Sequence, residues 1–474
     1  MFICNGLIPH LGILTIRTTL LYVCKRLCII ESSQVYMFTV SSEEKNNKSK
    51  PRVVIIGGGF GGLSLAKKLK NAPVEVLLLD RHNYHTFQPL LYQVAMGAVE
   101  ADSIGFPIRR IFTKHDNFSF NLADVQRVNP ETNTLTTNIG EIQYDYLVIA
   151  TGSNTNFFGN KQIEHFAMPM KNIPEALNIR SLIIQNLETA LVTKDMKEKF
   201  ALMTFVVVGG GPTGVELAGA LAEMRHLVLA KDYHGLSKYD MRVHLVEGKT
   251  KLLASFSQGA SEKAEKFLTD AGVDILKGVH VESYDGFHLK IDNGKIFKTR
   301  NVLWAAGVKG EMPEGMPPDV VTKGNRLYTD NVNRVKGYQN IFAIGDVAAI
   351  ITDETPNGHP GVAPVAIQQG EWLAKNLVRL IKGEAPEPFK YVDKGSLATI
   401  GRNKAVADIG KLHFQGFFAW LLWGVVHIMS LAGFTNKGII FLSWAMNYFT
   451  KNSDNRLVVR YFNTQTRMTD PESK

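Results

Sequence analysis

The chain has 474 residues, of which 45% are hydrophobic and 20% are charged, and its formal net charge is +9 at pH 7. This length allows two or three domains with buried cores, and the composition is that of an ordinary globular protein. The positive charge favours an anionic partner such as an acidic membrane surface, with a merely solvated basic surface as the alternative. No nucleic-acid-binding signature accompanies the charge, so we expect no nucleic-acid partner.

Cysteine usage excludes several kinds of chemistry. Cys4, Cys24 and Cys28 are the three cysteines of the chain, and all of them precede Met37. A disulfide framework, an iron–sulfur site and thiol redox catalysis in the core are therefore excluded. The histidines show no metal-ligand spacing, and we expect no metal.

Residues 1–36 are apolar and poor in acids, but Arg17 and Lys25 interrupt the apolar runs, which are too short to span a bilayer. A targeting peptide is one interpretation. A start codon assigned upstream of the natural one, or a disordered extension, is the favoured one. We therefore expect residues 1–51 to form an N-terminal extension to the folded chain.

The first glycine-rich turn follows the apolar run 53–56. Gly57 permits a tight turn, Gly59 lets the backbone approach a diphosphate, and Gly62 lets the following helix pack closely on the strand. Asp80 lies 18 residues beyond Gly62, at the end of the next apolar run, where a carboxylate can hold ribose hydroxyls. The spacing predicts a strand–helix–strand unit that binds a dinucleotide.

A second turn of the same kind follows residues 205–208, with Gly209, Gly211 and Gly214 in the same positions. Its acid, Glu247, lies 33 residues beyond Gly214, so extra structure is expected around residues 224–242. A carboxylate at that strand end repels a 2′-phosphate, which favours NADH over NADPH.

Glu216 follows the second turn by two residues and has two interpretations. An acid in the first turn of a helix commonly stabilises the helix dipole. The functional interpretation places Glu216 near the contact between a nicotinamide and a flavin.

The segment 414–450 carries only one formal charge, Lys437, and it is rich in Trp and Tyr. A transmembrane helix over the uncharged run 417–434 and a buried or dimerisation helix are two possibilities. We favour an amphipathic helix lying in the plane of a membrane, because aromatic residues suit the interface and basic residues flank the segment. These residues are Lys411, Lys437, Lys451, Arg456 and Arg460.

With these residues in hand, the chain closely resembles the type II NADH dehydrogenases, single-subunit and non-proton-pumping NADH:quinone oxidoreductases of the two-dinucleotide-binding-domain flavoprotein superfamily. The most specific segment is 80–95, Asp-Arg-His-Asn-Tyr-His-Thr-Phe-Gln-Pro-Leu-Leu-Tyr-Gln-Val-Ala. Residues 150–152, 303–307, 344–346 and 363–370 also match. Many members have Gln where this chain has Pro364, so no contact is carried over at that position.

The resemblance implies an α/β protein with two Rossmann-like domains, the NADH domain inserted into the FAD domain, and a C-terminal amphipathic membrane-anchoring segment. The expected boundaries are 52–165 and 326–410 for the FAD domain, 166–325 for the NADH domain, and 411–474 for the membrane-association region. The FAD contacts that it implies are Gly57, Gly58, Gly59, Phe60, Gly61, Gly62, Asp80, Arg81, Gln88, Val125, Thr151, Gly152, Gly345, Asp346 and Ala363. NADH is expected at Gly209, Gly211, Gly214, Glu247 and Gly307, and the catalytic residues implied are Glu216, Gln368 and Gln369.

The implied activity is hydride transfer from NADH to FAD, followed by two-electron reduction of menaquinone or ubiquinone. The expected partners are the quinone, a membrane lipid surface and a possible second copy in a homodimer. The expected location is the cytoplasmic face of a cell inner membrane, with an organelle membrane second. Two alternatives remain: a soluble NADH-dependent reductase of a small electron-transfer protein, and a redox-sensing flavoprotein similar to the apoptosis-inducing-factor group.

Overall fold

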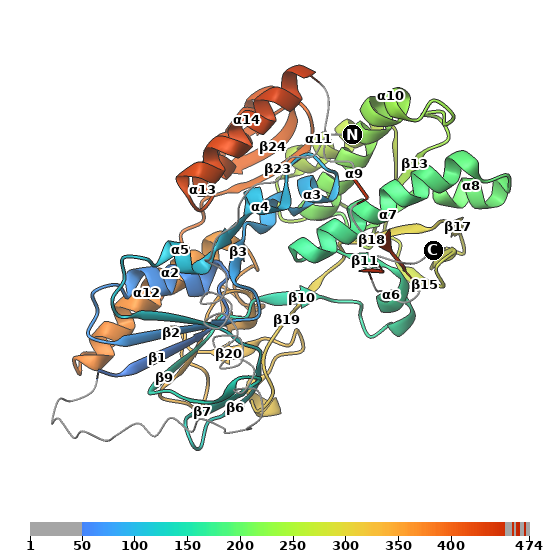
Figure 1. The fold of residues 1–474 in the computed structure, drawn as a ribbon. Helices are drawn as coiled ribbons and strands as arrows, with labels where there is room; N and C mark the ends of the chain where they lie inside the picture. The colour runs from blue at the N-terminus through green and yellow to red at the C-terminus, as the bar shows by residue number, and fades with distance from the viewer. Residues whose placement is uncertain (1–49, 451–456, 459–460, 465–468, 471–474) are drawn as a thin grey trace, which may run out of the picture. The chain divides into compact units, whose positions relative to one another are not determined.

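The computed structural model describes residues 50–450, 457–458, 461–464 and 469–470 (Figure 1). Residues 1–49 of the expected N-terminal extension lie outside the described residues. So do Lys451, Arg456 and Arg460 at the far end of the chain.

The first glycine turn belongs to a five-stranded parallel sheet with the strand order β21-β9-β1-β2-β5. Its strands are β1 (Arg52–Ile56), β2 (Glu75–Asp80), β5 (Phe118–Leu122), β9 (Tyr146–Ile149) and β21 (Ile341–Ala343). The inner strands are continuous apolar runs because both faces of the sheet are covered. Since β21 comes from late in the chain, everything between β9 and β21 is inserted into this sheet.

The second glycine turn belongs to a second five-stranded parallel sheet, ordered β11-β18-β12-β13-β14. Its strands are β11 (Met168–Pro169), β12 (Thr204–Val208), β13 (Arg242–Glu247), β14 (Val273–Lys277) and β18 (Asn301–Trp304). In both sheets the strand before the glycine turn is central and pairs with the acid-tipped strand. The predicted pair of Rossmann-like sheets is confirmed.

Two helices cover one face of the first sheet: α2 (Phe60–Lys68), which follows the glycine turn, and α12 (Ala363–Ile381). They cross closely, because a Cβ on Gly370 would lie 2.4 Å from the Gly61 carbonyl oxygen. The start of α12, which contains the matched residues 363–370, is thereby held beside the first glycine turn.

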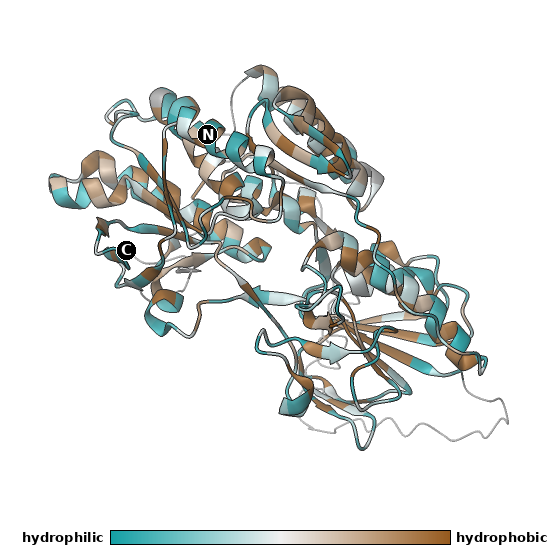
Figure 2. Ribbon diagram, turned by 180° about the vertical axis from the view of Figure 1, so that it is seen from behind, coloured by the Kyte–Doolittle hydropathy of each residue, from teal (hydrophilic) through white to brown (hydrophobic). Residues whose placement is uncertain are grey.

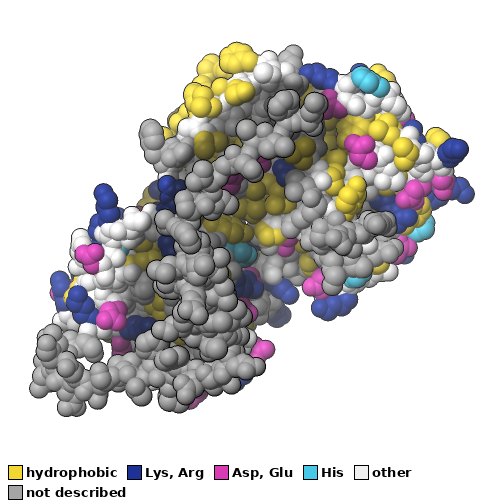
Figure 3. All heavy atoms as spheres, viewed as in Figure 1, with side chains coloured by type: hydrophobic (Ala, Val, Ile, Leu, Met, Phe, Trp, Pro, Cys, Tyr) yellow, Lys and Arg dark blue, Asp and Glu magenta, His cyan; other side chains and the backbone are white. Residues whose placement is uncertain are grey.

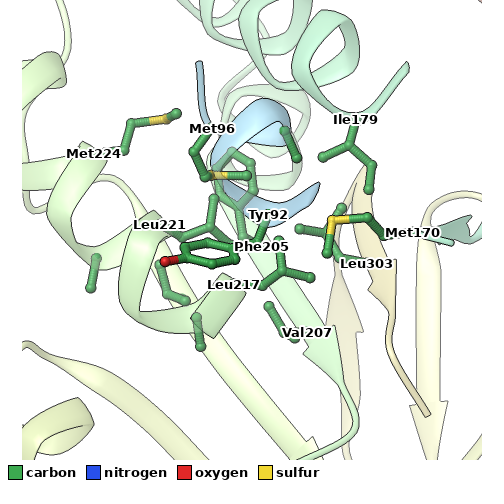
Figure 4. Close-up of a cluster of buried hydrophobic side chains, with 14 of the residues drawn as sticks. Tyr92, Met96, Met170, Ile179, Phe205, Val207, Leu217, Leu221, Met224 and Leu303 are labelled. Carbon is green, nitrogen blue, oxygen red and sulfur yellow. The ribbon is translucent and has the colours of Figure 1, made fainter. Parts of the chain in front are cut away.

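The second sheet is packed by α7 (Ile173–Val192), α9 (Pro212–Met224) and α11 (Gln258–Asp270). The short helix α3 (Leu91–Ala95), from the family-like segment 80–95, packs against α7 and α9. Figure 4 shows Tyr92 of α3 lying among Leu217 and Leu221 of α9, above Phe205 of β12. This contact brings the first half of the chain onto the second sheet.

The two halves are joined by a short antiparallel ribbon, β10 (Ser153–Thr155) and β19 (Val308–Gly310), one strand leaving the first half and the other returning. The extra residues expected between α9 and β13 form a π-helical turn, Arg225–Leu229, and α10 (Ala230–Asp232). Three 3-10 turns lie at Gln88–Leu90, Pro318–Val320 and Gly345–Val347.

The remaining short helices are α4 (Ala101–Ile104), α5 (Ile108–Ile111), α6 (Lys161–Phe166) and α8 (Met196–Leu202). The remaining strands are β3 (Tyr84–Thr86), β4 (Gly105–Pro107), β6 (Val125–Asn129), β7 (Thr134–Thr137), β8 (Gly140–Gln143), β15 (Val281–Tyr284), β16 (His288–Ile291), β17 (Ile296–Lys298), β20 (Leu327–Thr329), β22 (Ala348–Ile350), β26 (Tyr461–Phe462) and β27 (Thr469–Asp470).

The C-terminal part begins with an antiparallel sheet of β23 (Ser396–Gly401), β24 (Lys404–Ile409) and β25 (Leu412–Gln415). Two helices follow, α13 (Phe417–Ser430) and α14 (Phe434–Thr450), and both are largely hydrophobic in Figure 2. A turn at residues 431–433, with Gly433 at φ +81°, separates them and interrupts the uncharged run 417–434. No helix in the described part of the chain has the length and apolarity needed to cross a membrane.

Candidate active site

The first glycine turn is held by its own strand-end acid. Gly57 has φ +106°, and its N–H donates to the Leu79 carbonyl oxygen at 2.8 Å. The Gly58 N–H donates to Oδ2 of Asp80 at 2.6 Å. The residue before α2 is Gly59, so no side chain caps the first N–H groups of α2, and a Cβ at Gly59 would meet open space. An uncapped helix start beside a carboxylate is the arrangement that a dinucleotide requires.

A cavity of about 610 Å³ opens at this turn, at the carboxyl edge of the first sheet. A Cβ on Gly62 would lie 2.0 Å from the Gly57 carbonyl oxygen, so this glycine seats α2 on its strand and does not line the cavity. Nine of the residues expected to contact FAD line it: Gly57, Gly58, Gly59, Phe60, Asp80, Arg81, Gln88, Val125 and Thr151. A cavity of this size, with these walls, fits a dinucleotide.

The other expected FAD residues do not line the cavity themselves but lie next to residues that do. The Ser153 hydroxyl lines the cavity and donates to Oδ2 of Asp346 at 2.6 Å. Gly61 faces α12, Gly152 lies between the lining residues Thr151 and Ser153, and Ala363 begins α12. Gly345 donates its N–H to Oε1 of Gln369 at 2.7 Å. These residues shape the wall or hold other wall residues.

Sequence reasoning missed several polar groups of the same cavity. Glu311 accepts from Nη2 of Arg81 at 2.6 Å, and Nζ of Lys171 donates to Oγ of Ser153 at 3.1 Å. Both come from segments next to the joining ribbon and the second sheet, far from the first glycine turn in the chain. Spacing in the sequence gave no signal for either residue: in the structure Glu311 follows β19, and Lys171 precedes Asn172, the N-cap of α7.

The second turn repeats the first. Gly209 has φ +113° and donates its N–H to Val246 O at 2.8 Å, and the Gly210 N–H donates to Oε2 of Glu247. Gly211 precedes α9 and Gly214 packs on the Gly209 carbonyl. Gly307 is exposed, with φ +76°, on the turn after β18. The structure therefore brings Gly209, Gly211, Gly214 and Glu247 together as a second dinucleotide turn.

Glu216 lies in the second turn of α9 and is buried. The interpretation of Glu216 as a dipole partner in the first turn is wrong, because the first turn of α9 holds no acid. Burial raises the pKa of Glu216 to about 8, although a backbone hydrogen bond from Thr399 lowers it in part. At neutral pH the side chain is therefore largely protonated.

A second cavity, which we call the apolar cavity, has a volume of about 360 Å³ and lies between α3, α9, β23, α13 and α14. Glu216 and Tyr92 are among the residues that line it. A hydrogen-bonded chain runs from Tyr92 to α14: Nε1 of Trp444 donates to Oε1 of Gln93 at 2.8 Å, and Nε2 of Gln93 donates to the Tyr92 hydroxyl at 2.9 Å. Burial raises the pKa of Tyr92 well above its ordinary value, and the nearby Glu216 adds to this.

Aromatic rings of α13 and α14 also line the apolar cavity. Trp423 stacks on Trp444 with ring centroids 5.2 Å apart and on His427 at 4.3 Å. Burial lowers the pKa of His427 to about 4, so this imidazole is neutral. The stacked rings of Trp423 and Trp444 therefore give the cavity a flat surface that suits a planar apolar molecule.

Gln368 and Gln369 do not line the apolar cavity. The Gln368 amide exchanges two hydrogen bonds with the backbone of Val392, at 2.9 and 3.0 Å. Gln369 is 1% exposed and its side chain holds Gly345. The structure thus separates these two glutamines from Glu216.

The outer faces of α13 and α14 carry exposed apolar side chains. Figure 3 shows hydrophobic side chains gathered over α14 at the top of the view. Among the described residues of the two helices, the exposed large ones are Phe417, Phe418, Leu421, Val425, Val426, Met429, Ile439, Phe441, Leu442, Met446 and Phe449. An exposed patch of this kind marks an interaction surface.

Comparison with known proteins covers nearly all of the described chain. The family profile described as pyridine nucleotide-disulphide oxidoreductase matches residues 51–370, and that of the NDH2 C-terminal domain matches residues 394–451. The chain is 36% identical to the type II NADH:quinone oxidoreductase Ndh of Mycobacterium tuberculosis, over 84% of this chain and 88% of the relative. It is 29% identical to the internal alternative NAD(P)H-ubiquinone oxidoreductase A1, mitochondrial, of Arabidopsis thaliana, over 84% of each chain.

Among solved structures, the chain is similar to NDH2 from Plasmodium falciparum in complex with NADH, with a TM-score of 0.79 and 22% identity. The match covers 87% of this chain and 100% of that chain. At this identity the match shows a common fold.

Proposed function

The chain belongs to the type II NADH:quinone oxidoreductases, within the pyridine nucleotide-disulphide oxidoreductase family, and from this premise we propose how its residues divide the work. The reaction oxidises NADH and reduces a quinone by two electrons. FAD, when bound, supplies the redox chemistry, so no side chain changes its oxidation state. The protein binds, orients and supplies protons.

We infer that the 610 Å³ cavity holds FAD. The N-terminus of α2 and the turn at Gly57–Gly59 would bind the diphosphate, and Asp80 would bind a ribose. Asp346 would bind the ribityl chain, since its neighbour Ser153 lines the cavity. Gln369 acts as a positioning residue, because its amide holds Gly345 beside Asp346.

NADH is proposed to bind at the second turn. The N-terminus of α9 would hold its diphosphate, and Glu247 would accept from the ribose hydroxyls. One carboxylate oxygen of Glu247 accepts a hydrogen bond from the Gly210 N–H, and the other accepts one from the Lys249 N–H at 2.7 Å. The carboxylate is therefore fixed at the strand end. A fixed carboxylate repels a 2′-phosphate, which is why we expect NADH to be favoured.

We propose that the quinone enters through the apolar cavity. Its stacked Trp423 and Trp444 suit a planar ring, and the cavity runs from α13 and α14 to Glu216. With a pKa of about 8, Glu216 carries a proton at neutral pH that it is able to give to a reduced quinone. Gln368 would have to exchange its Val392 backbone partner in order to reach a quinone carbonyl.

The exposed apolar faces of α13 and α14 support attachment to a membrane lipid surface, from which the quinone would come. We propose that these helices lie in the membrane plane as an amphipathic anchor. The proposed location is the cytoplasmic face of a cell inner membrane, or an organelle membrane. A homodimer and the choice between menaquinone and ubiquinone stay predictions.

The observation that carries the acceptor proposal is the apolar cavity that joins Glu216 to the apolar helices. Ala220→Trp would fill it, because Ala220 lines the cavity. We expect at least a tenfold higher KM for a ubiquinone or menaquinone analogue, with unchanged NADH oxidation by ferricyanide, a soluble acceptor that needs no apolar cavity. Ala385→Trp, at an exposed site, is the control. Equal quinone kinetics in the two variants would refute this route.

A further inference from the structure

A basic cavity lies on the second half of the chain, beneath the segment inserted between α9 and β13. The π-helical turn Arg225–Leu229 gives successive side chains to two different cavities. Leu227 and Val228 line the apolar cavity, whereas Arg225 and His226 line this one. π-Helical turns are rare and frequently occur at functional sites.

The basic cavity has a volume of about 540 Å³. Basic side chains come to it from three parts of the chain, namely the π turn, the loop before β13 and the start of β13 itself. Its titratable lining consists of Arg225, His226, Lys238, Arg242, His244 and Asp274, with Tyr239 at the rim.

The charges in the basic cavity are unbalanced. In the described part of the chain, no Asp or Glu lies within ion-pair distance of Arg225, Lys238 or Arg242. Asp274 is already engaged by Nδ1 of His244 at 2.9 Å and by Nζ of Lys295 at 3.8 Å. Burial lowers the pKa of His226, and the charges of Arg225 and Lys238 lower it further. The cavity therefore has a positive potential.

The cationic groups are held in place by neutral partners. The Arg225 guanidinium donates to the carbonyl oxygens of Ala271 and, at 3.2 Å, Gly272, at the end of α11. The Arg242 guanidinium lies over the Phe200 ring, 4.3 Å from its centroid. These contacts fix the two guanidinium groups in position but do not neutralise their positive charges. The groups are therefore pre-organised to bind an anion.

We propose that the basic cavity binds a phosphate-bearing ligand, a phosphomonoester or a diphosphate. A dianion matches several cations, and guanidinium groups recognise phosphate by paired hydrogen bonds. The site is separate from the NADH turn. Arg242 begins β13 and Glu247 ends it, which places them roughly 17 Å apart along the strand. The phosphate could belong to a soluble molecule or to a lipid headgroup.

Inorganic pyrophosphate is the probe for the first test. Its binding to the FAD-loaded enzyme would be measured by titration calorimetry with NAD⁺ at saturation, so that the second dinucleotide turn is occupied. We expect one saturable site, weakened about tenfold or more in K238Q/R242Q, because two charge-assisted contacts are lost. K298Q/K336Q removes the same charge at exposed positions outside the cavity and should change the affinity less than about twofold.

K238R/R242K keeps both charges and should retain most of the affinity, which separates loss of charge from loss of fold. Cosedimentation with phosphatidylcholine vesicles, with and without phosphatidic acid, then identifies the source. If phosphatidic acid increases cosedimentation of the parent protein and of K298Q/K336Q but not of K238Q/R242Q, the natural ligand is a lipid headgroup. If phosphatidic acid still increases cosedimentation of K238Q/R242Q while its pyrophosphate binding is weakened, the natural ligand is a soluble phosphate. No saturable binding of either probe, or equal losses in K238Q/R242Q and K298Q/K336Q, would overturn the proposal.

Discussion

At the scale of single residues, Asp80 and Glu247 do the same work in the two sheets. Each accepts a hydrogen bond from the second glycine of its turn and another from the residue two positions after itself. The same carboxylate that would meet a ribose therefore also fixes the glycine turn. A substitution at either acid changes both the recognition of the ribose and the shape of the turn.

Glu247→Gln tests the recognition of the ribose. The amide oxygen can still accept the Gly210 N–H, but the negative charge that repels a 2′-phosphate is gone. We expect the preference for NADH over NADPH, measured as the ratio of the two kcat/KM values, to fall about tenfold, equivalent to about 1.4 kcal/mol. An unchanged ratio would show that Glu247 does not meet the ribose.

Glu216 predicts a dependence of stability on pH. Its folded pKa of about 8 lies above the ordinary 4.5, so between these values the folded state binds more protons than the unfolded state. The free energy of unfolding should then fall as pH rises from 4.5 to 8, by at most about 5 kcal/mol from this group. Glu216→Gln should remove that slope. Urea unfolding of both proteins at several pH values measures it, and parallel pH profiles would contradict the assignment.

The sequence predicted the residues of the site whose roles are local. Gly57, Gly62 and Asp80 lie within one strand–helix–strand unit, so their spacing specifies their geometry. Lys171 and Glu311 reach the same cavity only because β10 and β19 pair across the two halves. A contact between residues so distant in the chain has no signature in spacing.

At the scale of elements, the helical pair α13–α14 combines two tasks. Its inner face supplies the Trp423–Trp444 stack, and its outer face is apolar and exposed. The composition of residues 414–450 predicted an apolar segment but left three arrangements open. The chain breaks between the two helices at residues 431–433, where Gly433 adopts the left-handed region with φ +81°. Hydropathy alone does not predict the position of this break.

Met429→Glu combined with Met446→Glu tests the outer face. These side chains are 68% and 61% exposed and do not line the apolar cavity, so little core packing is lost. We expect vesicle cosedimentation to fall at least about fivefold, because charges disfavour insertion into the lipid interface. NADH oxidation by ferricyanide should be retained.

The control for these substitutions is Val192→Glu with Met196→Glu. Both side chains are at least as exposed, at 78% and 71%, but they lie at the end of α7 and the start of α8. If this control lost vesicle binding to the same extent, the loss would come from net charge and α13–α14 would not be the attached surface.

At the scale of the whole molecule, the two glycine turns predicted the two sheets, and the family resemblance implied the late return of the chain to the first. It did not predict where the C-terminal part docks. The structure packs β23 on α9, where Glu223 accepts the Arg402 N–H at 2.6 Å. The Arg402 guanidinium in turn donates to the carbonyl oxygens of Asn447 and Tyr448 on α14. Through Arg402, α9 of the second half thus holds the helices that line the apolar cavity.

Gly219→Ala tests this docking, because Gly219 of α9 lies directly against the backbone of β23. A Cβ there would lie 2.5 Å from the Ile400 carbonyl oxygen, so backbone must move. Gly259→Ala on α11 is the matched control, since its Cβ would meet Gln415 at an ordinary 3.7 Å. The control should gain up to about 1 kcal/mol from helix propensity, whereas Gly219→Ala should lose about 1–3 kcal/mol to overpacking. Urea midpoints measure both changes. We also expect Gly219→Ala to raise the KM for quinone and to leave NADH oxidation by ferricyanide unchanged. If the two variants had equal urea midpoints and equal quinone KM values, the C-terminal part would not depend on this contact.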